Sequence, residues 1–224
     1  LARMPARLID RHPELSPGRI LAELVPPPHF ADVRFGTFLP DPEQPSQGAA
    51  VTALRAFARG TDAAPARRRG RLGRRRTAAP ERTGSYLDGG FGVGKTHLLA
   101  SLWYEASHPK AYGTFVELTN LVGALGFEAA ATALGQHRLL CIDEFELDDP
   151  GDTVLMSSLL RRLVESGVRL AATSNTLPGK LGEGRFAADD FMREIQGLSA
   201  YFDVLRIDGE DYRHRGLSPA PEPY

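Results

Sequence analysis

The chain has 224 residues, 42% of them hydrophobic and 25% charged, with a formal net charge of −1 at pH 7, which excludes a chain that is disordered throughout. No apolar run approaches the roughly 18 residues of a membrane-spanning helix, and the first residues show no charged-then-apolar secretion signal. A single cysteine excludes an internal disulfide and a thiolate metal site, which fits the reducing cytoplasm. The length allows one α/β domain or two small ones.

The first 60 residues predict an extension that wraps a core. Residues 5–24 alternate apolar and polar positions at helical spacing, and three consecutive prolines at 26–28 end this helix. Residues 29–47 combine aromatic residues with prolines, which predicts an extended segment. Ser46 is a candidate N-cap for a helix that ends near Gly60. We therefore expect residues 1–60 to be an N-terminal wrapping extension.

Residues 61–83 predict a mobile basic loop, because their Ala, Arg, Gly and Pro leave almost nothing to bury. Residues 51–82 hold ten arginines against two acidic residues, a local charge of +8. These arginines could contact nucleic-acid phosphates, but no aromatic residue is interleaved among them to stack bases. We favour a solvated loop; nucleic acid, acidic protein surfaces and membranes stay open as partners. The arginines concerned are Arg67, Arg68, Arg69, Arg71, Arg74, Arg75, Arg76 and Arg82.

Residues 84–210 alternate short apolar strands with helical patterns. Strands are predicted at 86–87, 113–118, 139–142, 168–173 and 203–207, and helices at 95–107, 119–134, 151–166 and 186–200. Uniformly apolar strands alternating with helices predict an α/β fold, a five-stranded parallel sheet with helices on both faces. Residues 211–224 form a Pro-rich tail.

A glycine-rich motif follows the first strand of this core and opens a helix. It fits the pattern G-x-x-x-x-G-K-[ST], the signature of a P-loop that cradles phosphates with backbone N–H groups. Lys95 would then neutralise the β- and γ-phosphates, and the Thr96 hydroxyl would bind Mg²⁺. The alternative is a glycine-rich turn with an incidental lysine, although the chain has only three lysines. The candidate nucleotide-binding residues are Gly89, Gly90, Phe91, Gly92, Val93, Gly94, Lys95 and Thr96.

The apolar run 139–142 is followed by Asp143 and Glu144. Asp143 lies 48 residues after Lys95. Asp143 at the carboxyl end of a parallel strand can bind Mg²⁺, and Glu144 can accept a proton from an attacking water. Because phosphoryl transfer to a hydroxyl does not need a base for water, this pair favours hydrolysis. We interpret Cys141 as ordinary core packing.

The strand predicted at 168–173 is followed by Ser174 and Asn175. If this strand lies beside the strand that leads into the P-loop, Asn175 would face the γ-phosphate and orient the water. The alternative is that Asn175 only forms the turn before Pro178.

The order of these motifs resembles that of AAA+ ATPases, and their amino-acid sequence resembles the ZapE family of cell-division ATPases over residues 20–215. The matching segments are YLDGGFGVGKTHLL, CIDEFELDDPGDTVLMSSLL, ATSNTLP, VLRIDGEDYRHR and, upstream, PPPHFADVRFGTFLPDPEQPSQ. The resemblance implies Mg²⁺-dependent ATP hydrolysis, ring-like homo-oligomers and action on a protein substrate, the FtsZ division polymer. It also implies that the N-terminal extension contacts the adenine, with Gln47 as one candidate.

Two family features are harder to place. AAA+ proteins carry a helical lid after the fifth strand, whereas this chain has only residues 211–224 there, so either the lid is missing from this chain or hydrolysis is poor. The resemblance also implies an arginine supplied by a neighbouring subunit. Arg185 and Arg193 are the candidates, with Arg161 and Arg162 as rivals and an ordinary surface role as the alternative for each.

Two other functions use the same motifs. A replicative helicase loader, a nucleotide-gated module that binds single-stranded DNA, would use the basic loop, but the ZapE-like segments count against it. A protein that binds ATP without turnover would show nucleotide affinity and no phosphate release.

Overall fold

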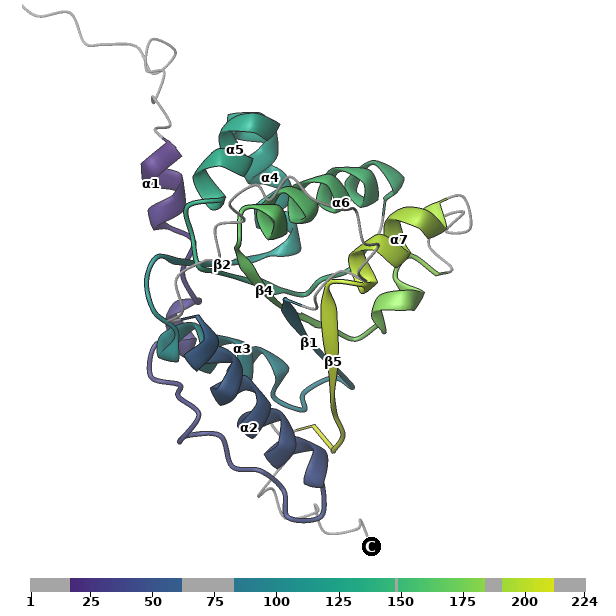
Figure 1. The fold of residues 1–224 in the computed structure, drawn as a ribbon. Coiled ribbons are helices and arrows are strands. Elements are labelled where there is room, and N and C mark those ends of the chain that lie inside the picture. The colour runs from purple at the N-terminus through teal and green to yellow at the C-terminus, as the bar shows by residue number, and fades with distance from the viewer. Residues whose placement is uncertain (1–16, 62–82, 148, 184–190, 212–224) are drawn as a thin grey trace, which may run out of the picture.

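The core is one five-stranded sheet in which all strands run parallel, in the order β2-β3-β4-β1-β5 (Figure 1). It is seen in a computed structural model that describes residues 17–61, 83–147, 149–183 and 191–211. The predicted fold class is confirmed. The strands are β1 Gly84–Gly89, β2 Lys110–Thr114, β3 Leu139–Asp143, β4 Arg169–Ser174 and β5 Phe202–Ile207.

Helices cover both faces of the sheet, α4, α5 and α6 on one and α2 and α3 on the other (Figure 1). Alternate residues of β3 enter opposite cores: Leu140 and Ile142 belong to the first, Leu139 and Cys141 to the second. Cys141 is buried and free, as its interpretation as a core residue predicted. The helices are α1 Pro17–Ala22, α2 Pro45–Gly60, α3 Lys95–Glu105, α4 Phe115–Leu125, α5 Phe127–Leu134, α6 Pro150–Glu165 and α7 Met192–Ser199.

The strand register brings the carboxyl ends of the strands to one edge of the sheet. Asp88 of β1 pairs with Ser174 of β4, and Thr114 of β2 pairs with Asp143 of β3. The loop after β1, the acidic residues after β3 and the polar turn after β4 therefore meet at this edge, where open α/β sheets bind ligands.

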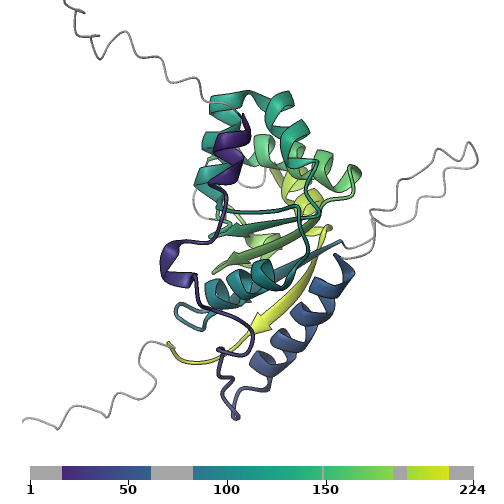
Figure 2. The same cartoon turned by 90° about the vertical axis from the view of Figure 1, so that its left-hand side faces the viewer.

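Residues 23–44, here called the N-terminal strap, link α1 to α2 and include a short 3-10 turn at Pro28–Phe30. Figure 2 shows the strap in purple, descending from α1 past α3 to the start of α2. Its Leu24 carbonyl accepts a hydrogen bond from the Tyr112 N–H of the edge strand β2, at 2.9 Å. Its Phe35 and Phe38 side chains are buried in the core beneath α3. The strap is thus fixed to the sheet domain at both ends.

Three local predictions were wrong. The strand placed at 113–118 ends at Thr114, because Thr114 and Glu117 form a capping box that starts α4. The single helix predicted for 119–134 is two helices, separated by Gly126 with φ +79°. Ser46 does not cap α2: its Oγ accepts a hydrogen bond from the Asp208 N–H at 2.9 Å instead.

The other predicted strands and helices lie within about two residues of those observed wherever the chain is described. The predictions for residues 1–16, most of the basic loop (62–82), Arg185 with its neighbours and the tail from 212 lie outside the described residues.

Candidate functional site

The loop between β1 and α3 has the backbone that phosphate binding requires. Gly92 and Gly94 have φ values of +70° and +94°, which only glycine adopts without strain. Each is also closely approached: a Cβ at position 94 would lie 2.6 Å from Cε2 of Phe38, and one at position 92 would overlap the Asp211 carboxylate. Gly94 is also the N-cap of α3, so the amino end of this helix faces the loop.

Lys95 connects the loop to β4. Its Nζ donates hydrogen bonds to the carbonyl oxygens of Gly89 at 2.7 Å and Gly90 at 2.6 Å, and to Oδ1 of Asn175 at 2.8 Å. The residue is only 9% exposed, and this burial lowers the pKa of its ammonium group from the usual range, against the raising effect of nearby carboxylates. Phosphate oxygens are stronger acceptors for this ammonium than the neutral oxygens that now hold it.

Asp143 lies at the tip of β3 and is 5% exposed. Three hydroxyl groups donate to its carboxylate: Thr96 to Oδ1 at 3.2 Å, Tyr112 to Oδ2 at 2.8 Å, and Thr173 to Oδ1. Burial, followed by the charge of Asp143, raises the pKa of Tyr112 well above its usual range, so this phenol stays a donor.

The pair formed by Thr96 and Asp143 fits Mg²⁺. Both donors are hard oxygen atoms, the atoms that this ion prefers, and they already lie within hydrogen-bond distance of each other. Over the described part of the chain, no group of three or more His, Cys, Asp or Glu could hold a metal ion. Magnesium sites of NTPases typically use one or two protein ligands and leave the remaining positions to phosphates and water.

Glu144 is exposed and adopts a left-handed backbone with φ +53°, unusual for a residue other than glycine. Its N–H donates to Oγ1 of Thr173 at 3.1 Å, which fixes this conformation. Among the described residues its carboxylate has no hydrogen-bond or ion-pair partner. A non-glycine residue held in this region of backbone space is common at functional sites.

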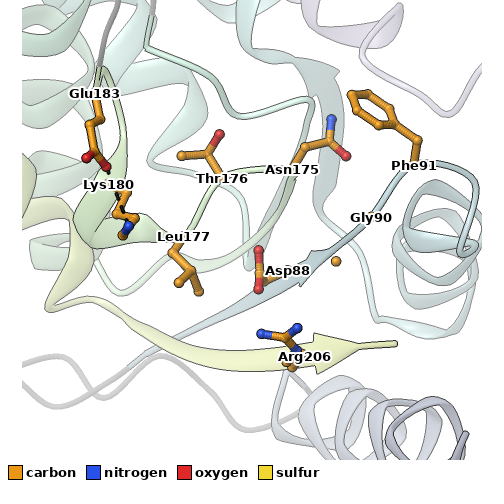
Figure 3. Close-up of a pocket in the computed structure, with 10 residues that line it drawn as sticks. Asp88, Gly90, Phe91, Asn175, Thr176, Leu177, Lys180, Glu183 and Arg206 are labelled. Carbon is orange, nitrogen blue, oxygen red and sulfur yellow. Dashed lines mark ion pairs between the residues drawn. The ribbon is translucent and has the colours of Figure 1, made fainter. Parts of the chain in front are cut away.

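A cavity of about 470 Å³ opens beside the loop, on the side of β4 and β5 (Figure 3). This volume lies within the usual range of small-molecule sites. Figure 3 shows the Asp88 side chain directed into it from β1, facing Arg206 of β5. The lining residues are Asp88, Gly89, Gly90, Phe91, Asn175, Thr176, Leu177, Lys180, Glu183 and Arg206.

A profile of the AFG1-like ATPase family matches residues 15–223. The chain belongs to this family. Known proteins similar to it include the Cell division protein ZapE of Escherichia coli K12, 33% identical over 150 residues that cover 61% of this chain and 40% of ZapE. Lactation elevated protein 1 homolog B of Danio rerio is 33% identical over 99 residues, 44% of this chain and 20% of that protein. This AFG1-like chain thus spans about 40% of the length of ZapE.

Solved structures with the AAA+ fold resemble this AFG1-like chain. DnaI superposes with a TM-score of 0.64 at 16% identity, covering 87% of this chain and all of that chain. The DnaC helicase loader superposes with a TM-score of 0.53 at 16% identity, covering 81% of this chain and 99% of that chain. At such identities the likeness shows the fold alone.

The sequence-predicted residues divide into those that the AFG1-like fold brings together and those that it does not. At one edge of the sheet, Lys95 is hydrogen-bonded to Asn175 and Thr96 to Asp143, and Glu144 follows Asp143 directly. Arg193 is exposed on α7, and none of the contacts described for the chain joins it to this group. No described helix is long and apolar enough to cross a membrane.

Gln47 does not fit the suggested base contact. Its side chain is fully buried, with Oε1 accepting from the Asp41 N–H at 2.9 Å and Nε2 donating to the Asp208 carbonyl at 2.8 Å. The amide therefore binds the strap to the end of β5. Its helical position alone could not show this, because both partners are backbone groups and one of them, at Asp208, is 161 residues away.

Three side chains of the site escaped the sequence analysis: Tyr112, Thr173 and Glu146. The first two hold Asp143. Glu146 accepts hydrogen bonds from the turn that carries Asn175. The hydrophobic pattern could have placed Tyr112 within β2 and Thr173 near the end of β4, but not in contact with Asp143.

Proposed function

We propose that this AFG1-like chain binds ATP with Mg²⁺ at the carboxyl edge of its sheet and hydrolyses it. The observation that carries this proposal is the chain of contacts from Asn175 through Lys95 to the loop, and from Thr96 to Asp143. A surface lysine after a glycine-rich turn would not be buried against three oxygen acceptors from the end of β1, the loop and the turn after β4.

The loop amides and Lys95 would bind the phosphates and offset their negative charge. Thr96 and Asp143 would hold Mg²⁺, which when bound supplies further charge neutralisation on the phosphate oxygens. Asn175 would orient the attacking water beside the γ-phosphate. Glu144, whose carboxylate is exposed and unpaired within the described chain, would accept a proton from that water.

The partner and the assembly are also part of the proposal. Since the Escherichia coli relative is named a cell division protein, we propose a division protein, FtsZ, as the substrate that hydrolysis remodels. A homo-oligomeric ring would bring an arginine, Arg185 or Arg193, to the neighbour's γ-phosphate. The exposed position of Arg193 on α7 is compatible with such a contact.

The test is phosphate release by the wild type and by Glu144→Gln, with and without purified FtsZ. Replacing a general base should lower the rate by about 10²- to 10⁴-fold, while ATP affinity changes little. Glu105→Gln is the matched control, because Glu105 is an exposed glutamate at the far end of α3. Equal rates for wild type and Glu144→Gln would contradict the catalytic assignment; no response to FtsZ would contradict only the partner.

A further inference from the structure

Glu146, the second acidic residue after β3, holds the turn after β4. Its Oε1 accepts hydrogen bonds from the Ser174 hydroxyl at 2.6 Å and the Asn175 N–H at 3.1 Å. Its Oε2 accepts from the Thr176 hydroxyl at 3.0 Å. One carboxylate thus fixes three successive residues, with the candidate γ-phosphate contact in the middle.

The same turn is held from other directions. The Thr176 N–H donates to Oγ of Ser174 at 2.9 Å, and the hydroxyl of Tyr86, from β1, donates to the Thr176 carbonyl at 2.7 Å. The turn around Asn175 is therefore hydrogen-bonded both to the segment after β3 and to β1. Only its side chain reaches toward the loop, where it meets Lys95.

The segment that carries Glu146 also carries the candidate base. Between them, the Phe145 N–H donates to the Thr173 carbonyl at 2.7 Å, and the Glu144 N–H donates to Oγ1 of Thr173. Residues 144–146 and 173–176 are therefore hydrogen-bonded to each other beyond the regular sheet. A displacement of one segment moves the other.

We propose that Glu146 is a positioning residue that fixes Asn175 relative to Glu144, so that contact with the γ-phosphate and activation of water occur in one geometry. This inference rests on the proposed ATPase function. Glu146 touches neither nucleotide nor water in this scheme and acts through the Asn175 backbone.

The chemistry of the contacts distinguishes two substitutions. In Glu146→Gln the amide oxygen can still accept from Ser174 and Asn175, and its NH₂ group can donate to the Thr176 hydroxyl, which is also an acceptor. Glu146→Ala removes all three contacts and leaves the Asn175 N–H without this acceptor. The first variant removes only the negative charge, whereas the second removes all three hydrogen bonds to the turn.

The experiment compares the two variants with the wild type in phosphate release and in the ratio of ATP to ADP affinity, measured with fluorescent nucleotides. We expect Glu146→Ala to lower kcat and the affinity ratio by about 10- to 100-fold, the range for charge-assisted hydrogen bonds, and Glu146→Gln to stay within about threefold. A purely structural role would lower the melting temperature but leave the affinity ratio unchanged. An unchanged ratio in Glu146→Ala, or equal defects in both variants, would overturn the proposal.

A double-mutant cycle with Asn175→Ala completes the test. If Glu146 acts through Asn175, Glu146→Ala should not reduce the affinity ratio further in the Asn175→Ala background. Independent, additive losses would overturn the inference. Should Glu146→Ala fail to fold, the cycle uses Thr176→Val, which removes the hydrogen bond from the Thr176 hydroxyl to Glu146. A wild type that discriminates ATP from ADP but releases no phosphate would refute the proposed hydrolysis and still leave the affinity ratio to decide the role of Glu146.

Discussion

Phe38 of the N-terminal strap should affect nucleotide binding as well as stability. Its ring is 3% exposed, lies 5.5 Å from the His97 ring between centroids, and contacts the loop at Gly94. Truncating a buried phenylalanine to alanine costs about 3–5 kcal/mol, a large share of the roughly 5–15 kcal/mol that stabilises a typical domain. For a chain of this size, this loss corresponds to a fall in melting temperature of roughly 6–20 °C.

The effect on binding follows from where the cavity forms. The space left by Phe38→Ala lies against the left-handed residue that starts α3, so the loop loses a wall that holds its conformation. A loss of preorganisation of about 1.4 kcal/mol weakens nucleotide affinity tenfold, and we expect at least this change.

Phe35→Ala is the matched control. Phe35 belongs to the same strap, is also 3% exposed, and lies in the same core, but its ring lies against Arg55 of α2, whose guanidinium carbon is 5.6 Å from the ring centroid. The two variants should lose similar unfolding free energy in urea, while only Phe38→Ala binds ATP more weakly.

Affinities should be measured near 15 °C, where stability is close to its maximum, after circular dichroism has shown both variants to be folded. Equal losses of affinity in the two variants would mean that global stability, not the contact with the loop, controls binding. An unfolding cost below about 1 kcal/mol for Phe38→Ala would refute the packing argument itself.

Two further predictions concern stability. Burial raises the pKa of Tyr86 above its usual value of about 10, so above pH 10 only the unfolded chain releases the phenol proton. The difference in unfolding free energy between wild type and Tyr86→Phe should therefore be constant below pH 10. Above pH 10 it should shrink by up to about 1.4 kcal/mol per pH unit. Urea unfolding at pH 8 and pH 10.5 checks this, and a difference that grows with pH would contradict it. Gln47→Ala should cost about 2–5 kcal/mol in the same assay, because the Asp41 N–H and the Asp208 carbonyl both lose their bond to the buried amide. A cost below 1 kcal/mol would show that these groups find other partners.

The positions of the loop, the acidic pair and Asn175 at one edge of the sheet could be predicted, because each depends on a short stretch of sequence. The tight turn of the loop needs glycines within the loop itself, and the apolar strand β3 ends on the candidate metal ligand Asp143. The parallel sheet then brings strand ends together without any knowledge of side-chain packing. The fold, and the place of the candidate site residues at one edge of the sheet, therefore follow from short segments and one topological rule.

Errors arose where local preferences compete. Phe115 and Val116 extend the β-type pattern past the end of β2, but the capping box of Thr114 and Glu117 starts a helix there. Ser46 is a good N-cap by residue type, yet its hydroxyl binds the backbone after β5. In both places a hydrogen bond decides between two structures of similar local propensity.

The supporting residues could not be predicted, because their partners are remote in sequence. Tyr112 reaches Asp143 across 31 positions, and Glu146 reaches the Asn175 turn across 28–30. Without the pairing register of β3 and β4, the sequence would equally allow Glu146 to be a solvent-exposed carboxylate after a strand. Only the pairing of β3 with β4 gives it three donors.

The contacts of Asn175 divide its roles between backbone and side chain. Under the proposed function, phosphate oxygens would take Lys95 away from the Asn175 amide, because an ammonium binds an anion more strongly than a neutral oxygen. The amide would then be free to contact the γ-phosphate and water, while the backbone stays bound to Glu146 and the Thr176 carbonyl to Tyr86. A side chain that exchanges partners on a backbone that does not move is suited to detecting the third phosphate without disturbing the position of Glu144.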